Sequence, residues 1–524
     1  MAQDLADFAA ERGVKYFMIS YTDLFGGQRA KLVPAQAIAD MQRDGAGFAG
    51  FATWLDLTPA HPDLFAIPDA ASAIQLPWKK EVAWVAADCV MDDAPIAQAP
   101  RVLLQRQVER ARAQGLRVKT GVEAEFFLVT RDGSAISDAA DTAEKPCYDQ
   151  QAVMRRYDVI AEICDAMLGL GWKPYQNDHE DANGQFEMNW EYDDALATAD
   201  KHSFFKFLVK SIAEKHGLRA TFMPKPFRHL TGNGCHAHVS IWDKTGKRNL
   251  FFDRKDPAGL TRLAYHFIGG IIHGAGELCA VFNPTVNSYK RINAPRTLSG
   301  ATWAPNAISY SGNNRTHMIR IPEAGRFELR LADGAANPYL LQAGLLVAGM
   351  DGIAKSTDPG PRLDINMYTH GHTVADAKKL PSNLLDALRA FVDRRAGFAN
   401  RTQRVGASLC DASADDGFGK AVIAIQAIHL QSFADGDAFF GQVFFDKDRE
   451  QFACVFAHLF AEEQIQMRPA AGTIHAMQTA NALSGQIEFG AVFPQSHATE
   501  FAAAVQLRHQ RRVNVVYRAG KIVI

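Results

Sequence analysis

The sequence predicts a protein of two or three domains, in which a small and mostly β module precedes a larger α/β or α+β domain. A chain of 524 residues exceeds the size of one ordinary domain. Strand-like runs dominate its first hundred residues, and strand-like and helical runs then alternate from residue 118 to about residue 353. The pattern changes again beyond about residue 393.

The N-terminal module begins with a predicted β-hairpin. Residues 14–37 alternate apolar and polar side chains around the turn-like sequence DLFGG at 23–27. Further strand-like runs occur at 72–76 and 82–91. Together these runs predict a small sheet.

A helix is predicted directly after this module. Pro95 and Pro100 interrupt the strand pattern, and apolar residues then recur at helical spacing over 101–114. Gly115 ends the helical pattern, because glycine is common just beyond the last turn of a helix.

Composition limits the classes of function. With 47% hydrophobic and 22% charged residues, the chain has the composition of a soluble globular protein. A formal net charge of −2 provides no basic surface for nucleic acid or for an anionic membrane, and no apolar run approaches the ~20 residues of a membrane span. The N-terminus lacks a secretory pattern, and the seven cysteines form no CxxC pair. We therefore expect reduced thiols and a cytoplasmic location.

The first candidate site is an acidic pair in the strand-like run GVEAEFFL at 121–128. Side chains alternate between the two faces of a strand, so Glu123 and Glu125 point the same way. Two carboxylates on one face repel each other unless a cation lies between them. A solvated strand face is the alternative, although the flanking apolar residues favour a buried one.

A second acidic pair lies in the sequence DHEDANGQFE at 178–187. Asn-Gly is a strong signal for a two-residue hairpin turn. A turn of that kind at 183–184 would place Glu180 directly opposite Glu187, with Cβ atoms roughly 5 Å apart. Like charges in that position favour a divalent cation between them, and a polar surface hairpin is the alternative.

Histidines and arginines complete the pattern. The sequence GNGCHAHVS at 232–240 places two imidazoles on one strand face, and one histidine among oxygen ligands suits Mg²⁺ or Mn²⁺. Histidines that form hydrogen bonds in a core are the alternative. In the sequence RFELR, Arg326, Glu328 and Arg330 share one strand face. Arginine side chains bind carboxylates and neutralise a phosphoryl group in transfer, although a single surface arginine is weak evidence.

Taken together, the carboxylates, the histidine and the arginines indicate a metal–phosphate site, and the chain has neither a nucleophile elbow nor a Walker-type loop. Over residues 10–393 the chain resembles the glutamine synthetase family, whose motifs it contains in the family's order: GVEAEFFL, DHEDANGQFEMN, TFMPKPF, GNGCHAHVSIW, NPTVNSYKR, NNRTHMIRIP and RFELRLADGAANPYL. The stretches GAGFAG, KPCYD and LSGATWAP are similar to those of the type III (GlnT-like) glutamine synthetases and the γ-glutamylmethylamide synthetases.

The resemblance implies an α+β fold with an N-terminal β-grasp domain at 1–97 and a catalytic domain at 98–393, whose curved antiparallel sheet forms a funnel. It also implies a homo-oligomer, either a hexameric ring or a dodecamer, in which a neighbour's N-terminal domain completes each site. Residues 394–524 form an atypical extension of unknown role. Because this extension replaces the helical segment that joins two rings in the family, the second ring is in doubt.

The resemblance also implies two or more divalent metals, Mg²⁺ or Mn²⁺, held by six side chains. One metal would be held by Glu125, Glu180 and Glu187. The second, which bridges the phosphates of ATP, would be held by Glu123, His236 and Glu328.

The same comparison implies residues for both substrates. Arg291 and Arg330 would bind L-glutamate together with the backbone of Gly232. The groups expected at the nucleotide, either at its phosphates or at its base, are Arg315, Arg320, Arg326, Ser240 and Tyr192. In the implied reaction the γ-carboxylate of glutamate attacks the γ-phosphate of ATP, and an amine then attacks the resulting γ-glutamyl phosphate.

Two positions depart from the ammonia-using members of the family. Ala49 stands where those enzymes have an aspartate, and Trp303 stands where they have a glutamate on a flap. A site for ammonium needs negative charge, whereas alanine and tryptophan form an apolar wall that suits an alkyl group. Trp303 could also attract an alkylammonium ion through its ring, worth roughly 0.5–2 kcal/mol. We therefore expect methylamine or another small alkylamine as the acceptor. A glutamine synthetase that uses ammonia, and a non-catalytic nucleotide-binding scaffold, are the alternatives.

Overall fold

The computed structural model describes residues 4–295, 297, 299, 302–375 and 377–391, together with three short strands near the C-terminus. The chain divides into two compact units, Met1–Gly436 and Asp437–Ile524. The described part of the second unit is one antiparallel sheet of β18 (Gly490–Ala491), β20 (Lys521–Val523) and β19 (Val516–Arg518). The remainder of the extension at 394–524 lies outside the described residues.

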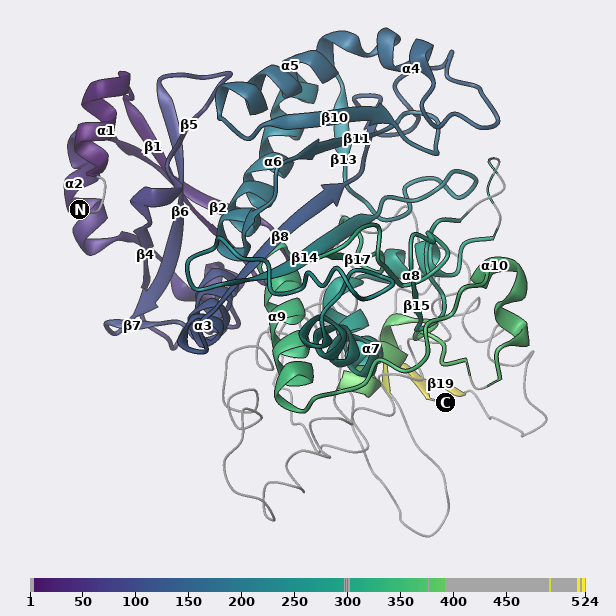
Figure 1. Ribbon diagram of the computed structural model, residues 1–524. Helices are drawn as coiled ribbons and strands as arrows, with labels where there is room; N and C mark the ends of the chain where they lie inside the picture. The colour runs from purple at the N-terminus through teal and green to yellow at the C-terminus, as the bar shows by residue number, and fades with distance from the viewer. Residues whose placement is uncertain are drawn as a thin grey trace. The chain divides into compact units, whose positions relative to one another are not determined.

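The first unit begins with a seven-stranded sheet (Figure 1). Its path runs through β2 (Gln28–Pro34), β1 (Tyr16–Thr22), β6 (Val82–Met91), β4 (Leu64–Pro68) and β3 (Ala46–Phe48), and the short strands β5 (Ile74–Gln75) and β7 (Ala94–Pro95) also pair with β6. The helices α1 (Leu5–Arg12) and α2 (Ile38–Asp44) accompany this sheet. The predicted hairpin and the predicted strand at 82–91 are confirmed, whereas the run at 72–76 forms a strand of two residues.

Two further sheets lie in the remainder of this unit. The four-stranded sheet has the order β10 (Pro174–His179), β11 (Gln185–Trp190), β9 (Phe126–Val129) and β13 (Arg219–Thr221). The six-stranded sheet has the order β12 (Asp193–Asp194), β8 (Leu116–Ala124), β14 (Cys235–Asp243), β17 (Phe327–Leu329), β16 (Ile319–Arg320) and β15 (Tyr310–Ser311). The chain passes from β8 into β9 at Glu125, so this residue lies where the two sheets meet.

Helices pack against these two sheets. The α-helices of this region are α3 (Pro100–Ala113), α4 (Gln150–Arg155), α5 (Tyr157–Gly169), α6 (Ala195–Lys215), α7 (Arg262–Phe282), α8 (Val286–Ile292), α9 (Pro338–Ala354) and α10 (Met367–His370). α9 packs against α3, α6 and α7 and is buried along most of its length, as expected for a helix that is apolar on all sides. The predicted helix at 101–114 is confirmed as α3, and the predicted α+β class is confirmed as well.

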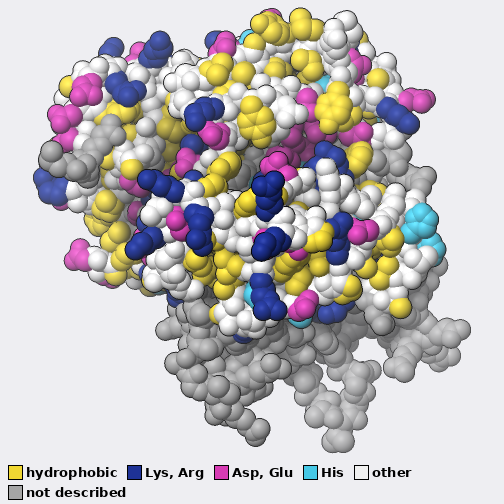
Figure 2. All heavy atoms as spheres, in the orientation of Figure 1, with side chains coloured by type: hydrophobic (Ala, Val, Ile, Leu, Met, Phe, Trp, Pro, Cys, Tyr) yellow, Lys and Arg dark blue, Asp and Glu magenta, His cyan; other side chains and the backbone are white. Residues whose placement is uncertain are grey.

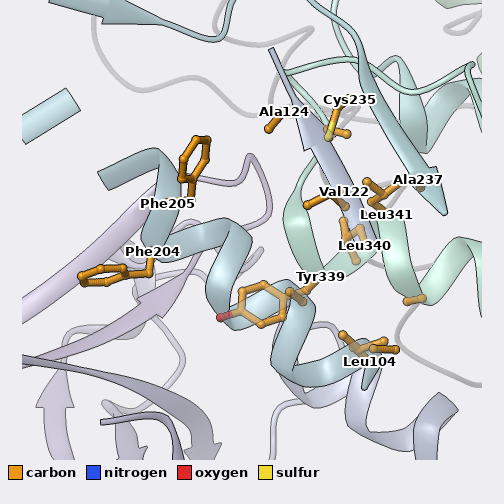
Figure 3. Packing of buried hydrophobic residues seen from close by; sticks show 14 of the residues in the cluster. Leu104, Val122, Ala124, Phe204, Phe205, Cys235, Ala237, Tyr339, Leu340 and Leu341 are labelled. Carbon is orange, nitrogen blue, oxygen red and sulfur yellow. The ribbon is translucent and has the colours of Figure 1, made fainter. Parts of the chain in front are cut away.

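The alternation of side chains along β8 and β14 separates the core from the polar face. Val122 of β8 packs beside Leu340 and Leu341 of α9, and Ala124, Cys235 and Ala237 belong to the same buried cluster (Figure 3). Because successive side chains on a strand point to opposite faces, the intervening residues of both strands point away from this core. These intervening residues are the acidic and imidazole side chains of the predicted site.

The cysteines of the described region are all free thiols. Three of them are buried and behave as small apolar residues, namely Cys89, Cys235 and Cys279, whereas Cys147 and Cys164 are half-buried. Cys410 and Cys454 lie outside the described residues. Among the helices that the structure describes, none combines the length and the apolar character needed to cross a membrane.

A buried arginine connects the N-terminal sheet to the helices. Arg101 of α3 is 3% exposed and donates to Asp200 of α6 through two bonds of 2.9 Å. It also donates to Asp88 of β6 at 2.7 Å and to Asp69 at 2.6 Å. Tyr339 of α9 donates to the same Asp200 at 2.8 Å. One guanidinium therefore fixes the positions of the β6 strand and of the α6 and α9 helices.

Replacing this arginine should destabilise the fold. Arg101→Ala would leave three carboxylates without their buried cation, and breaking such a pair typically costs about 3–5 kcal/mol of unfolding free energy. Arg112→Ala on the same helix is the matched control, because its pair with Glu109 is exposed on both sides and should contribute little. Thermal and urea unfolding measure both variants. Equal stability of the two variants would contradict the assignment of Arg101 as a connecting residue.

Candidate active site

The polar faces of the two catalytic-region sheets converge at the junction of β8, β10, β11 and β14. Figure 2 shows acidic side chains in a shaded hollow on the viewer's side of the molecule, with lysine and arginine side chains along its lower edge. The residues of this region come from segments that lie far apart in the chain, as far as Glu123 is from Arg330. Their separation in sequence means that the fold alone brings them together.

Three carboxylates form the first candidate metal group. Glu125, Glu180 and Glu187 each offer an oxygen, and the three oxygens lie within 4.8 Å of one another. Burial, followed by repulsion from neighbouring carboxylates, raises the pKa of Glu180 and the pKa of Glu187 well above the ordinary value. Such a group is costly without a cation and is relieved when a divalent ion binds.

The hairpin that presents two of these residues has a different register from the predicted one. Asp178, and not Glu180, lies opposite Glu187, and His179 lies opposite Phe186. The predicted turn at Asn183-Gly184 forms, because Gln185 N donates to Ala182 O, but the predicted two-residue hairpin loop is wrong: the strands close at the bond from Glu180 N to Gln185 O. The loop is two residues longer on the β10 side. A shift of two residues keeps every side chain on its face, which is why Glu180 still points toward Glu187.

A buried network holds this loop in place. Asp141 accepts hydrogen bonds from His179 Nε2 at 2.7 Å, from Gly184 N at 2.6 Å and from Asn183 Nδ2 at 2.9 Å. His179 Nδ1 lies 2.9 Å from the carbonyl of Glu180. These bonds fix the backbone on both sides of Glu180, so the carboxylate is positioned before any ion binds.

A second group of acidic and imidazole side chains lies across β8, β14 and β17. His236 lies opposite Glu123 in the β8–β14 register, and His238 lies opposite Glu328 in the β14–β17 register. Oxygen and nitrogen atoms of Glu123, Glu187 and His236 lie within 4.8 Å of one another, and the same holds for Glu123, His238 and Glu328. The set expected from the sequence, Glu123 with His236 and Glu328, is also close, because His236 Nδ1 is 3.3 Å from Glu123 and 3.5 Å from Glu328.

The charges of this second group are balanced by neighbours. Burial raises the pKa of Glu123, but the adjacent His238 and His236 outweigh burial and hold it well below the ordinary value. The pKa of Glu328 is likewise raised by burial but lowered further by Arg330 and His236, to about 2. Both carboxylates are therefore ionised at neutral pH. The two groups differ in this respect, since Glu180 and Glu187 have raised pKa values, and no cation within the described residues offsets the burial and repulsion that raise them.

Arginines line the other side of Glu328. This carboxylate is fully buried and accepts from Arg330 Nη1 at 2.5 Å and from Arg320 Nη1 at 2.8 Å. Arg326 on the same strand face donates to His238 Nδ1, whose other nitrogen lies 2.8 Å from Glu123. The residues of the RFELR sequence share one face, as predicted, so the acidic region of the site continues into a cationic region.

Arg291 and two glycines lie at the inner end of the site. Arg291 is 2% exposed and donates to the backbone carbonyl of Leu331 at 3.1 Å. A Cβ atom on Gly234 would lie only 2.8 Å from His236 Nε2, 2.9 Å from Arg291 Nη2 and 3.0 Å from Glu125 Oε1. Gly232 is equally constrained, since a Cβ there would lie 2.2 Å from the carbonyl oxygen of Pro224. The two glycines leave room for functional atoms to converge.

The residues expected at the nucleotide base lie further along β8 and β14. Ser240 accepts from Trp242 Nε1 at 2.9 Å, and Trp242 stacks on Tyr192 with ring centroids 6.4 Å apart. Tyr192 is 48% exposed and Lys119 Nζ lies 4.4 Å from the centre of the Trp242 ring. An exposed aromatic surface with an adjacent cation can stack against a base. The structure thus places Ser240 and Tyr192 together and beside the acidic region.

Three of the expected residues are less closely joined to this arrangement. Arg315 is exposed, in the loop between β15 and β16. Trp303 has a φ of 52° and its Nε1 atom is buried, while Ala301 of the same flap lies outside the described residues. Ala49 is exposed on the N-terminal sheet, between β3 and the turn that follows it. No contact between Ala49 and the acidic groups is among those found within the described part of the chain.

Sequence reasoning missed the contacts of three residues in this region. The sequence predicts that His238 shares a strand face with the other imidazole. Its contacts with Arg326 and Glu123, however, form because β17 pairs with β14. Asp178 lies opposite Glu187, and burial and the nearby Glu123 raise its pKa to about 6. Asp141 lies in a loop without periodicity. Only Asp178 carries a useful signal, because it lies within the acidic motif, whereas the contacts of Asp141 with His179 and Gly184 are long-range.

The donor atoms of the described site fit divalent cations. The first group provides carboxylate oxygens alone, and the second adds imidazole nitrogen, a combination that suits Mg²⁺ or Mn²⁺. Among the described residues, His236 Nε2 is buried and forms no hydrogen bond, although Glu125 Oε1 is 3.9 Å away. A buried nitrogen without a hydrogen bond, surrounded by carboxylates, is the arrangement expected of a metal ligand before its ion is added.

Comparisons with known proteins agree with this arrangement. The family model described as glutamine synthetase, catalytic domain, matches residues 97–401. A glutamine synthetase of Rhizobium meliloti (strain 1021) is 74% identical over 391 residues, which cover 75% of this chain and 90% of that protein. A glutamate–methylamine ligase of Methyloversatilis universalis is 43% identical over 393 residues, covering 73% of this chain and 88% of that protein.

A solved structure titled "GmaS/ADP complex-Conformation 1" has 58% sequence identity to this chain and a TM-score of 0.78. The similarity covers 87% of this chain and 100% of that one. With a matching catalytic-domain model, relatives that align along three quarters of its length, and acidic and arginine groups converging on one sheet face, the chain belongs to the glutamine synthetase family of ligases.

Proposed function

We propose that this protein joins a small alkylamine, with methylamine as the first candidate, to the γ-carboxylate of L-glutamate in an ATP-dependent reaction. The observation that carries the proposal is the meeting of two oppositely charged regions on one face. The carboxylates Glu125, Glu180 and Glu187 lie on one side, and the guanidinium groups of Arg320 and Arg330 lie on the other. A site of this kind binds phosphate through cations and a carboxylate substrate through arginines.

The two acidic groups are proposed to hold Mg²⁺ or Mn²⁺ ions. Glu125, Glu180 and Glu187 would hold one ion, and Glu123, His236 and Glu328 would hold a second. Bound ions would neutralise the phosphate oxygens of ATP and so lower the repulsion that an approaching carboxylate meets. The protein's own contribution is to position these ligands in advance, as Asp141 and His179 do for the loop of Glu180.

The nucleotide is proposed to lie along β14 and β17. Tyr192 offers an exposed ring for the adenine, and Ser240 offers a hydroxyl nearby. Arg320 and Arg326 lie next to Glu328 and His238, where the phosphates would reach the second metal group. Arg315 is exposed in the preceding loop and would add positive charge as the γ-phosphate is transferred.

L-Glutamate is proposed to bind at the inner end of the site. Arg291 and Arg330 are buried cations, and the backbone at Gly232 lies so close to Pro224 and Arg291 that a side chain there would meet both. An oxygen of the γ-carboxylate attacks the γ-phosphorus of ATP, and the bond from that phosphorus to ADP breaks. The product, γ-glutamyl phosphate, has a carbonyl carbon with a good leaving group. A neutral amine then attacks this carbon, phosphate leaves, and the amine loses one proton.

The identity of the amine depends on Ala49 and Trp303. Trp303 has a buried indole nitrogen and adopts a left-handed backbone conformation that is unusual for a large side chain. An apolar wall favours an alkylamine, because it excludes water from the alkyl group and provides no carboxylate for ammonium. The relative named glutamate–methylamine ligase supports this acceptor.

Ammonia remains the second candidate acceptor, because the relative with 74% identity is named glutamine synthetase. A non-catalytic scaffold is disfavoured, since a scaffold would gain nothing from buried carboxylates that raise each other's pKa. We further propose that the active form is a ring-shaped homo-oligomer, because Ala49 is exposed on the N-terminal sheet, where it could complete a neighbour's site.

Metal binding should stabilise the protein in a pH-dependent way. With Mn²⁺ and ATP at a hundred times their dissociation constants, linkage predicts about 2.7 kcal/mol for each bound species and a higher thermal midpoint. The raised pKa values of Glu180 and Glu187 mean that, without metal, their contribution to stability is present below the ordinary pKa of 4.5 and is lost as pH rises through the raised value. Protons therefore compete with the ion at low pH, and the shift should be larger at pH 8 than at pH 5.5.

The matched variants for this measurement are Glu187→Gln and Glu191→Gln. Glu187 belongs to the first metal group, whereas Glu191 lies just beyond β11 in an exposed pair with Lys173. Glu187→Gln should abolish most of the Mn²⁺-dependent shift, and Glu191→Gln should retain it. No shift in the parent protein would instead favour the scaffold.

The acceptor preference can be measured directly. Phosphate release from ATP with glutamate and Mg²⁺ should give a kcat/KM at least tenfold higher for methylamine or ethylamine than for ammonium. The double variant Ala49→Asp with Trp303→Glu should lower this ratio by at least tenfold, because it adds the charge that ammonium requires. Ala10→Asp, at an exposed position of α1, controls for added charge on the N-terminal domain. Ammonium as the better acceptor of the parent protein would show that the second candidate is correct.

A further inference from the structure

The strand β11 carries a carboxamide on each side of its acidic residue. Gln185, Glu187 and Asn189 are alternate residues of β11, so their side chains share one face of the strand. The intervening Phe186 and Met188 belong to the buried hydrophobic core. The sequence QFEMN therefore places two neutral amides beside a carboxylate of the site, and none of the roles assigned above uses them.

Each carboxamide donates to a carboxylate of the first acidic group. Asn189 Nδ2 donates to Glu187 Oε1 at 2.8 Å. Gln185 Nε2 donates to Glu125 Oε2 at 3.0 Å, and the same oxygen accepts from Gly234 N at 2.7 Å. The amide nitrogen faces the carboxylate in both cases, because an amide oxygen in its place would be a second acceptor. Within the described residues, Glu187 Oε2 and Glu125 Oε1 accept no hydrogen bond, so each carboxylate keeps one oxygen available.

The oxygen atoms of the two carboxamides are buried and have no partner. Gln185 is fully buried and Asn189 is 7% exposed. Among the residues that the structure describes, neither Gln185 Oε1 nor Asn189 Oδ1 forms a hydrogen bond. A buried acceptor in this state costs stability, because its bonds to water are lost without replacement. An apolar side chain of similar size would avoid that cost, so an amide at both positions calls for a reason other than packing.

An amide holds a carboxylate without neutralising it. Glu328 in the second group shows the other arrangement, since it is paired with the guanidinium groups of Arg330 and Arg320. A guanidinium beside Glu187 would offset its charge and compete with a cation for its oxygens. An amide has no net charge, so a carboxylate that it orients keeps its full attraction for a divalent ion.

The orientation of these two carboxylates matters for both acidic groups. Glu125 Oε1, the oxygen without a hydrogen bond, lies 3.9 Å from His236 Nε2, the buried nitrogen that also has none within the described residues. Glu187 belongs to two of the candidate metal groups, one with Glu125 and Glu180 and the other with Glu123 and His236. A carboxylate that turned at either position would therefore change the arrangement of ligand atoms across the site.

We propose that Gln185 and Asn189 are positioning residues for a divalent cation, which hold one oxygen of Glu125 and of Glu187 and leave the other oxygen of each to the ion. This inference rests on the proposed function, because it takes Mg²⁺ or Mn²⁺ as the ligand of the first acidic group. Neither carboxamide binds the ion in this role. Each acts through the carboxylate that it orients.

The test measures Mn²⁺ affinity by calorimetric titration of the full chain without nucleotide or glutamate. Asn189→Leu and Gln185→Met keep the approximate shape of each side chain and remove its donor. Each should weaken Mn²⁺ binding by roughly 10–100-fold, as is typical when the partner of a metal ligand is lost. Gln176→Met is the matched control, since this exposed carboxamide lies opposite Asn189 in the β10–β11 register and donates to no carboxylate within the described residues. Its Mn²⁺ affinity should equal that of the parent protein.

Two further measurements separate positioning from a loss of folding. Gln185 Nε2 also donates to Asn233 Oδ1 at 2.8 Å, so Gln185→Met is expected to lose stability and Asn189→Leu is the decisive variant. Asn189→Leu removes a buried oxygen that has no partner, so its thermal midpoint without metal should stay close to that of the parent protein. With Mn²⁺ at saturation its electron paramagnetic resonance line shape should differ from the parent's, because a turned carboxylate changes the ligand field of the ion.

Weaker Mn²⁺ binding and an altered line shape in Asn189→Leu, with parent-like binding by Gln176→Met, support the inference. Unchanged Mn²⁺ affinity in Asn189→Leu overturns it, and so does an equal loss of affinity in the control. In both of those cases a parent protein that binds Mn²⁺ and turns over leaves the proposed function in place. A parent protein that binds no Mn²⁺ would overturn the metal assignment of the proposed function together with this inference.

Discussion

The repulsion among buried carboxylates is the constraint on which the rest of the structure depends. Oxygen atoms of Glu125, Glu180 and Glu187 lie within 4.8 Å of one another, and burial together with repulsion from neighbouring carboxylates raises the pKa of Glu180 and of Glu187. A loose backbone would let such a group move apart. Here each carboxylate comes from a different rigid segment: the β8–β9 junction, the loop fixed by Asp141, and the buried strand β11. The fold therefore holds the charges together at a cost in stability, which binding of a cation removes.

The core supplies the rigidity that this arrangement needs. Along β8 and β14 the alternate residues Val122 and Ala237 pack toward α9, while Glu123 and His236 point to the opposite face. A slip of one residue in this register would turn the charged side chains toward α9 and the apolar ones toward the polar face, so both faces select the same pairing. The buried Arg101 extends the same support into the N-terminal sheet through Asp88.

This coupling also explains what could be predicted from the sequence. Strand alternation is local, so the shared face of Glu123 and Glu125 and the α3 helix followed from the residues alone. The register of β10 and β11 did not follow from the residues alone. The Asn-Gly signal predicts a two-residue hairpin loop in isolation, whereas the loop here is two residues longer and Gly184 N donates a hydrogen bond to Asp141. The error left the site intact because the register shift is two residues, which keeps every side chain on its face. The contacts of His238 were missed for a different reason: its partners Glu123 and Arg326 lie 115 and 88 residues away on other strands, which no local period encodes.

The charge distribution at Glu328 links the acidic groups of the site to its arginine groups. This carboxylate is shared between His236 on the acidic side and the guanidinium groups of Arg320 and Arg330 on the other. Burial raises its pKa, but Arg330 and the two histidines His236 and His238 lower it to about 2, so Glu328 stays ionised and its charge is partly used before any ligand arrives. An ion that binds Glu328 would weaken its hold on both arginines and make them better donors to an anion. Cation binding on one side would then favour anion binding on the other, which is the order of events that transfer of a phosphoryl group between two anions requires.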